Sequence, residues 1–193
     1  ITNLDAKLRE QMLQEIRELQ RTIGTTIFYI THDQQAALQL CDKMAIMEQD
    51  GSLCQIGNDE DIILRPANRF TFEFIGVSNF VPLAAGAAQL DFGSVRYALD
   101  QAVPAEVLAR ANMEVGVRPN DIVFDKESPI RGTVKRCVFL GSEYDYFIMV
   151  GDRELRVQQS TLDANQRGVA KEGAEVGIRL LNPHFYEAKK EAV

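Results

Sequence analysis

The second part of the sequence is built from short apolar segments with turn-forming residues between them. The segments are Asn79–Leu83, Ala88–Phe92, Val95–Leu99, Glu114–Val117, Gly132–Leu140, Tyr144–Val150, Glu154–Gln158 and Glu175–Leu181. The intervening turn residues include Gly86, Gly93-Ser94, Pro119-Asn120, Gly141-Ser142, Gly151-Asp152, Gly168 and Gly173. Short strands that recur about every 8–12 residues are typical of a small all-β barrel or sandwich. We therefore predict a small all-β barrel or sandwich over residues 77–193, formed as one domain or as a pair of related modules.

Residues 1–76 follow a different pattern, in which helical and strand-like segments alternate. Apolar residues at helical spacing predict an amphipathic helix over residues 6–21. The segment 25–30, TTIFYI, is β-branched and aromatic, which predicts a buried strand. Two apolar runs around Asp50-Gly51 predict a hairpin, because glycine tolerates the positive φ of its turn. This order of elements is typical of part of an α/β domain.

The charge and the cysteines exclude several kinds of protein. The 193 residues carry a formal net charge of −7, which disfavours nucleic acid and anionic membranes as partners. The three cysteines are an odd number without close spacing, so we predict reduced thiols and neither a disulfide framework nor a zinc site. No apolar run is long enough to span a bilayer. The chain does not begin with Met, and we expect it to be a piece of a longer protein.

The predicted strand at 25–30 leads directly into the polar residues Thr31, His32, Asp33 and Gln34. His32 is one of two histidines in the chain, and a histidine at a strand end is often only a structural residue that bonds a nearby carbonyl. In an α/β domain, however, ligands bind at the carboxyl ends of the core strands. An imidazole there can donate to a phosphate or position a water molecule. From these residues alone, both interpretations of His32 stay open.

The same region resembles the second half of the ATP-binding subunit of ABC transporters. Thr2-Asn3-Leu4-Asp5 is similar to the D-loop of that family, and His32 matches its switch histidine. Further segments match in family order: Gln55-Ile56-Gly57, Arg65-Pro66-Ala67-Asn68-Arg69-Phe70, Phe74-Ile75-Gly76, Val117-Arg118-Pro119-Asn120-Asp121-Ile122 and Phe139-Leu140-Gly141-Ser142-Glu143. The second part then resembles the TOBE domain, an oligomer-binding-like accessory barrel of importers in the maltose, polyamine and ferric-iron group. The matches extend over nearly the whole chain.

The resemblance implies an α/β fragment of a nucleotide-binding domain at 1–76 and a regulatory and dimerisation barrel at 77–193. It implies that the intact parent protein uses ATP and Mg²⁺ to drive solute uptake, with ferric iron or polyamines slightly favoured. His32 would contact the γ-phosphate and the attacking water, and Asn3 and Asp5 would line the nucleotide-dependent dimer interface. The expected partners are a second copy, through the barrel and the D-loop, and the transmembrane permease subunits. The expected location is the cytoplasmic face of the cell membrane.

Three motifs of the family are absent from the sequence. It contains no GxxxxGK[ST] loop to cradle phosphates, no LSGGQ-like segment, and no apolar strand ending in Asp-Glu to supply the magnesium ligand and base. Phosphoryl transfer needs these parts together. We therefore expect the isolated chain to be inactive and to need no cofactor of its own. We also expect the strand at 25–30 to lack some of its neighbours. Either a second polypeptide supplies them, or the chain associates with itself, or residues 1–76 are poorly ordered, and we favour self-association.

A second hypothesis is a stand-alone module that senses an oxyanion or a metal ion through its barrel. It depends on the cationic residues of the second part, which would have to gather on one face. They are Arg118, Arg131, Lys135, Arg136, Arg153, Arg156 and His184. The intact D-loop and switch-histidine segments favour the transporter hypothesis, because a sensor would not need them.

Overall fold

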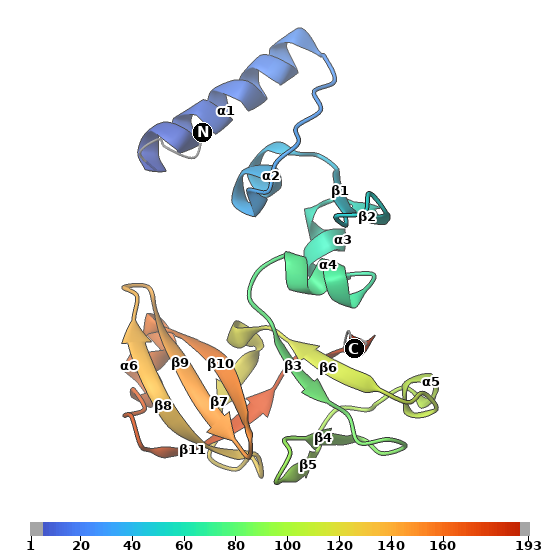
Figure 1. Cartoon of the computed structure of the whole chain (residues 1–193). Coiled ribbons are helices and arrows are strands. Elements are labelled where there is room, and N and C mark those ends of the chain that lie inside the picture. The colour runs from blue at the N-terminus through green and yellow to red at the C-terminus, as the bar shows by residue number, and fades with distance from the viewer. Residues whose placement is uncertain (1–5, 190–193) are drawn as a thin grey trace. The chain divides into compact units, whose positions relative to one another are not determined.

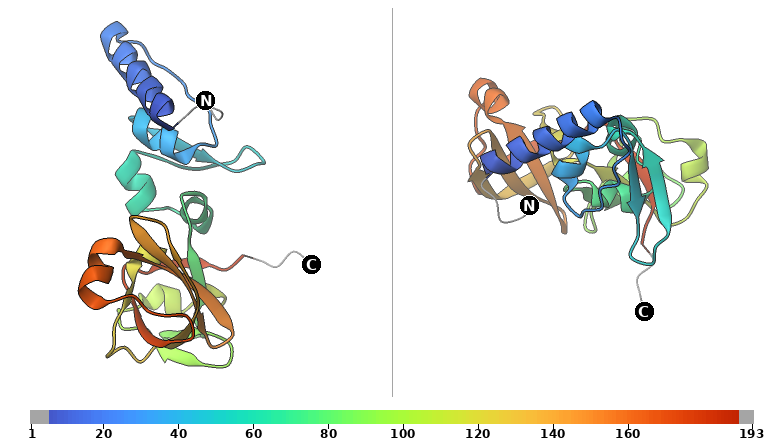
Figure 2. Two further views of the ribbon diagram at one scale, coloured as in Figure 1. Left: turned by 90° about the vertical axis from the view of Figure 1, so that its left-hand side faces the viewer. Right: turned by 90° about the horizontal axis from the view of Figure 1, so that it is seen from above.

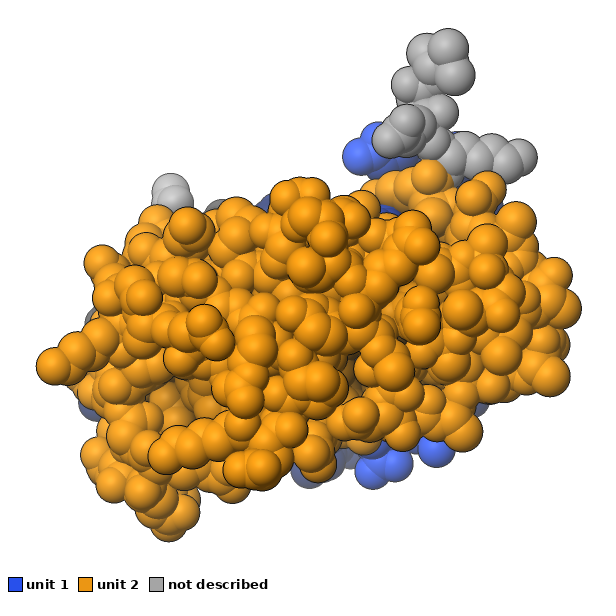
Figure 3. All heavy atoms as spheres, turned by 90° about the horizontal axis from the view of Figure 1, so that it is seen from below, with its two compact units in different colours: residues 1–75 blue, residues 76–193 orange. Residues whose placement is uncertain are grey.

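The chain divides into two compact units in the computed structural model, which describes residues 6–189. Unit 1 comprises residues 1–75 and unit 2 comprises residues 76–193. Figure 3 shows their surfaces in separate colours. The two units have different secondary structure, helices with one hairpin in the first and mostly strands in the second. Each is described here by itself.

Unit 1 contains four helices and one hairpin among its described residues. They are α1 (Ala6–Ile23), α2 (Gln34–Leu40), β1 (Met44–Met47), β2 (Leu53–Gly57), α3 (Asp59–Leu64) and α4 (Arg69–Phe74). The predicted hairpin is present, since β1 and β2 pair antiparallel across a turn in which Gly51 has a φ of +86°. Asn58 starts α3 with a capping box, in which its side chain and that of Asp61 bond each other's backbone N–H.

The predicted strand at 25–30 is wrong for this chain. Residues 25–30 have no regular secondary structure between α1 and α2 (Figure 1). Phe28 is 91% exposed and Ile30 is 97% exposed. The physical reason is the absence of a hydrogen-bonding neighbour, because β1 and β2 pair only with each other within the described part of unit 1. A β-branched sequence fits a strand, but only pairing and burial make it one.

The core of unit 1 is small. Its buried members are Met44, Ile46, Ile62 and Ile75, with partly buried side chains packed around them. On α1 the predicted amphipathic stripe is only partly covered, since Leu8 is 46% exposed and Leu19 is 56% exposed, whereas Leu13 beside it is buried. The helix is therefore present, with its apolar residues packed near its middle and exposed towards both ends.

Unit 2 is mostly antiparallel β-structure. Its elements are β3 (Asn79–Pro82), β4 (Gln89–Asp91), β5 (Arg96–Ala98), α5 (Ala105–Leu108), β6 (Met113–Val117), η1 (Pro119–Asp121), β7 (Ile122–Phe124), β8 (Arg131–Phe139), β9 (Glu143–Val150), β10 (Arg153–Ser160), α6 (Thr161–Arg167), β11 (Glu175–Leu180) and β12 (His184–Glu187). They form a five-stranded sheet ordered β10-β9-β8-β11-β7, a three-stranded sheet ordered β12-β6-β3, and the β4–β5 hairpin. Helix α6 follows β10 and packs at one end of the β9–β10 pair (Figure 2).

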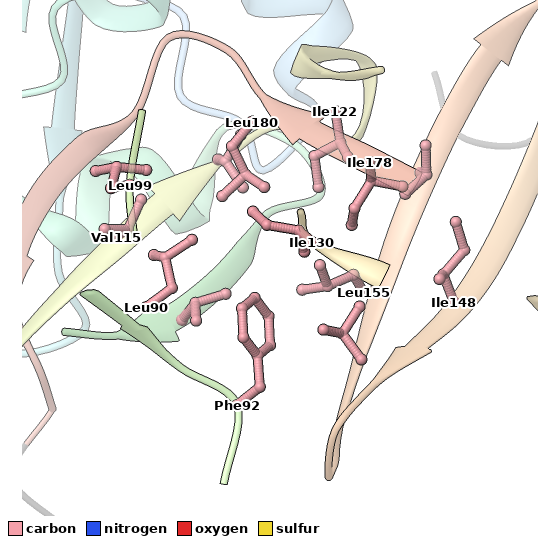
Figure 4. Packing of buried hydrophobic residues seen from close by; sticks show 14 of the residues in the cluster. Leu90, Phe92, Leu99, Val115, Ile122, Ile130, Ile148, Leu155, Ile178 and Leu180 are labelled. Atoms are coloured by element: carbon pink, nitrogen blue, oxygen red, sulfur yellow. The ribbon is translucent and has the colours of Figure 1, made fainter. Parts of the chain in front are cut away.

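A single large core holds the sheets of unit 2 together. Figure 4 shows side chains from different strands meeting in it, among them Leu90, Phe92, Val115, Ile148 and Leu180. The all-β character predicted for this part is thus confirmed. The ladders of backbone hydrogen bonds do not close into one barrel, because β10 and β7 are the ends of the five-stranded sheet.

Asn79 joins the two main sheets of unit 2 through its side chain. Its Nδ2 donates to the carbonyl oxygen of Arg156 at 2.8 Å, and its Oδ1 accepts from the Arg156 N–H at 2.8 Å. The amide therefore reproduces the pair of bonds that a neighbouring strand would make to β10. Because Asn79 is buried, both bonds are shielded from water.

Candidate functional site

His32 lies at the start of α2, between two residues that shape the chain locally. Thr31 Oγ1 accepts from the Asp33 N–H at 2.9 Å, and Asp33 caps α2 by accepting from the Ala36 N–H at 3.1 Å. Hydroxyl and carboxylate side chains commonly satisfy free N–H groups at a helix start. These two bonds fix the backbone on both sides of His32, and its imidazole is exposed.

An ion pair connects this turn to the first helix. Arg9 on α1 forms a salt bridge with Asp33, and Arg17 Nη1 donates to the carbonyl oxygen of Gln39 at 2.5 Å. The two contacts hold α1 along α2. The sequence analysis did not identify Arg9 as part of the site, and no motif could have done so, because its pairing with Asp33 depends on the packing of the two helices.

The residues around His32 line an open depression on the surface of unit 1. Its lining consists of Arg9, His32, Asp33, Gln34 and Gln35. The imidazole and the side-chain amide of Gln35 can donate hydrogen bonds to a phosphate or hold a water molecule, whereas the amide of Gln34 already donates to the carbonyl oxygen of Phe74. The charge of Arg9 is balanced by Asp33, so the depression has no surplus cation of its own. It can contribute a contact to a phosphate but not the cradle that binds one tightly.

The other two predicted nucleotide contacts, Asn3 and Asp5, lie outside the described residues. Within residues 6–189, no group of three or more His, Cys, Asp or Glu side chains is arranged to hold a metal ion. The depression therefore contains one of the three predicted site residues, His32, together with Arg9.

The cationic residues of unit 2 do not gather into one cluster. Arg118 Nη1 donates to the carbonyl oxygens of Gly76 and Val77 at 3.3 Å each, and to Ser78 Oγ at 2.6 Å. Burial lowers the pKa of the Arg118 guanidinium. It also lowers the pKa of His184, and the positive charge of Arg118 adds to this effect.

The remaining cations of unit 2 have other partners. Arg131 Nη2 donates to the Lys126 carbonyl oxygen at 2.7 Å, and Arg153 Nε donates to that of Asp91 at 3.1 Å. Arg136 and Arg156 flank the ring of Phe147 on the five-stranded sheet, and Lys135 adjoins Arg136 in β8. The seven cationic residues therefore do not share one face. Only Lys135, Arg136 and Arg156 lie near one another, on the five-stranded sheet.

The chain is similar to known proteins over most of its length. The family model described as the TOBE domain matches residues 115–185. The chain is 33% identical over 186 residues to the Fe(3+) ions import ATP-binding protein FbpC of Fusobacterium nucleatum, which covers 93% of this chain and 48% of the relative. It is 34% identical over 194 residues to the spermidine/putrescine import ATP-binding protein PotA of Thermobifida fusca, which covers 95% of this chain and 50% of the relative.

A third relative, the spermidine/putrescine import ATP-binding protein PotA of Clostridium novyi, is 33% identical over 190 residues, with 97% of this chain and 52% of the relative covered. The chain thus spans about half the length of the relatives that it matches. None of the helices within residues 6–189 combines the length and the apolar character needed to cross a membrane. The matched residues include both units, with the TOBE match confined to unit 2, and on these grounds the chain is related to the ATP-binding proteins of ABC importers that carry a TOBE domain.

Proposed function

We propose that this chain is the C-terminal part of the ATP-hydrolysing subunit of an ABC importer, with unit 1 completing an α/β nucleotide-binding domain and unit 2 regulating it. The observation that carries the proposal is an exposed histidine, His32, held at a helix start by side-chain bonds on both sides, in a chain related over nearly all its length to importer ATP-binding subunits. In this role, ATP binding and hydrolysis would be coupled to uptake of a solute.

His32 would act on the terminal phosphate of ATP. Its imidazole would hydrogen-bond the γ-phosphate and orient the attacking water, while Asn3 and Asp5 would contact the nucleotide across a dimer interface. ATP and Mg²⁺ would be held by the phosphate cradle and carboxylates of the remaining half of the subunit. These separate roles of the two halves fit the open depression around His32, which offers hydrogen-bond donors but no unpaired positive charge from Arg9.

The exposed apolar side chains of residues 25–30 indicate that this segment packs against a neighbour in the intact subunit. Phe28 and Ile30 are almost fully exposed, and the apolar stripe of α1 is only partly covered. Exposed apolar surface of this kind usually marks a contact with another segment or chain. We propose that residues 25–30 become a buried strand when the other half of the subunit, on the same or another polypeptide, lies beside them.

The partners follow from the same role. Two copies would associate through unit 2 and the D-loop region, and transmembrane permease subunits would hold them at the cytoplasmic face of the cell membrane. The names of the relatives include ferric iron and polyamine importers, and we propose a solute from these two groups.

A chimera tests this function. The half of the Thermobifida fusca relative that this chain does not match is fused to residues 1–193, and ATP turnover is measured by phosphate release. We expect turnover in the fusion and a loss of about 10²-fold or more in His32→Ala, as for removal of other groups that act on a proton or a water molecule. Gln39→Ala, an exposed substitution on the same helix, should leave turnover unchanged.

Equal turnover in the His32→Ala and Gln39→Ala fusions would show that the imidazole has no part in hydrolysis. A second measurement shows whether the fusion protein folds. Circular dichroism should show a gain in strand content relative to the sum of the two separate halves, as expected if residues 25–30 join a sheet.

A further inference from the structure

The outer face of the five-stranded sheet in unit 2 carries a row of three side chains from three neighbouring strands. Arg136 on β8 lies opposite Phe147 on β9, and Arg156 on β10 lies opposite the same Phe147. The Arg136 guanidinium carbon is 4.0 Å from the centre of the Phe147 ring, and that of Arg156 is 5.8 Å from it. Two cations therefore flank one aromatic ring on a sheet surface.

A β-bulge places Arg136 in this row. The register between β8 and β9 shifts between Val134 and Arg136, so that Lys135 is left without an opposite residue. Val134 is buried in the core, and regular alternation would turn residue 136 to that same face. The extra residue instead turns Arg136 outward, opposite Phe147. Bulges that redirect a side chain in this way are common next to functional sites.

The two arginines differ in their charge balance. Arg156 forms a bidentate pair with the buried Asp145, whose carboxylate accepts from Nε at 2.8 and 2.9 Å and from Nη2 at 2.7 Å. Arg136 stacks on Phe147, and neither it nor Lys135 has a salt bridge with any carboxylate among residues 6–189. A chain with a net charge of −7 thus has two adjacent exposed cations in β8 that no carboxylate among these residues pairs with, while Asp145 is paired with Arg156.

The stacked guanidinium has a specific chemistry. At 4.0 Å the guanidinium can lie face to face with the ring, and its N–H groups then point along the plane of the group, where they match the two oxygens of a carboxylate. The ring also fixes the guanidinium, which lowers the entropy lost on binding. The guanidinium of Arg136 and the neighbouring ammonium of Lys135 suit a single carboxylate. Nucleic acid requires many more cations, arranged along its phosphate backbone.

We propose that Arg136, oriented by Phe147 and flanked by Lys135 and Arg156, is a binding site for a carboxylate group. The carboxylate belongs either to a small organic acid or to an Asp or Glu side chain of a partner protein. The site lies on unit 2 and is independent of ATP, so its existence does not depend on the function proposed above.

Nuclear magnetic resonance of the full chain tests the site, with signals of the Arg136 side chain and the Phe147 ring as the readout. Succinate, citrate and a hexaglutamate peptide are titrated separately, each against sodium chloride at matched ionic strength. We expect saturable shifts of both residues with at least one carboxylate. Saturation by the small acids identifies a metabolite site, and saturation by hexaglutamate alone identifies a site for an acidic protein segment.

Three variants complete the test. Arg136→Gln should weaken binding by about tenfold or more, the effect of losing a charge-assisted pair. Arg136→Lys keeps the positive charge but loses the paired N–H donors of the guanidinium. Its affinity for the carboxylate should lie between that of Arg136→Gln and that of the original chain. Arg110→Gln removes an exposed arginine that pairs with Glu187 elsewhere in unit 2, and should bind like the original chain. The absence of saturable shifts, equal shifts with sodium chloride, or equal weakening in Arg110→Gln would overturn the proposal.

Discussion

The two units differ in how much of their apolar surface they cover. Unit 2 buries one continuous core to which all of its sheets contribute. The side chain of Asn79 in β3 also makes two hydrogen bonds to the backbone of β10. Unit 1 buries four hydrophobic residues in its central cluster and exposes the apolar residues Phe28 and Ile30. Since burial of apolar surface is the main favourable term in folding, unit 2 should be stable by itself, whereas unit 1 should depend on a partner.

The largest effect is expected from a cavity in unit 2. Phe92 is fully buried in the core, and Phe92→Ala should lower the free energy of unfolding by about 3–5 kcal/mol. Urea denaturation followed by circular dichroism measures this value. The matched substitution in unit 1 is Phe28→Ala, which should change the same quantity by no more than about 0.5 kcal/mol, because the ring is exposed. Similar losses in both variants would contradict the difference between the units.

A smaller effect is expected from the side-chain bridge between the sheets. Asn79→Ala removes two hydrogen bonds to the backbone of Arg156 and leaves its N–H and carbonyl without these partners. The loss in unfolding free energy should be about 1–3 kcal/mol. Hydrogen exchange at the Arg156 amide should accelerate, which locates the effect. Asn165→Ala, an exposed substitution on α6, serves as the control and should leave both values unchanged.

Tyr146, one of the buried tyrosines of unit 2, makes the stability of this unit depend on pH. Burial raises the pKa of Tyr146 from 10.0 to about 12. Because the folded form holds its proton more tightly than the unfolded form, stability from this group is complete below pH 10 and is lost as the pH rises from 10 towards 12. Tyr146→Phe should reduce this alkaline loss.

Tyr146→Phe should also lower the free energy of unfolding at neutral pH. Tyr146 Oη donates to Gln159 Oε1 at 2.9 Å, so Tyr146→Phe should lose about 1 kcal/mol there. Urea denaturation at pH 8 and at several values above 10 measures both effects. An alkaline slope identical to that of the original chain would assign the pH dependence to other groups.

Local chemistry explains which elements were predictable from the sequence. The hairpin at Asp50-Gly51 was correct because a tight turn is specified by the residues within it. The all-β nature of unit 2 was correct because its turns and apolar alternation repeat many times along the chain. His32 was predicted at the end of a strand and lies instead before the start of a helix, where its neighbours Thr31 and Asp33 accept hydrogen bonds from backbone N–H groups.

Features that depend on distant partners were not predictable. The strand at 25–30 was wrong because a strand exists only beside another, and the described part of unit 1 offers none. The Arg9–Asp33 pair depends on the packing of α1 against α2. The bulge at Lys135 is a shift of a single residue, and neither β-propensity nor alternation specifies it.

The last prediction concerns the exposed segment of unit 1 and should have the smallest effect on stability. Phe28→Ser combined with Ile30→Ser should leave the free energy of unfolding within about 0.5 kcal/mol of the original value, since both side chains are already in water. Its effect should instead be on association, which the exposed apolar side chains promote. Analytical ultracentrifugation over a range of concentrations should show less self-association for the double variant. A lower unfolding free energy with unchanged association would mean that residues 25–30 are packed within their own chain, and unit 1 would then need no partner to cover them.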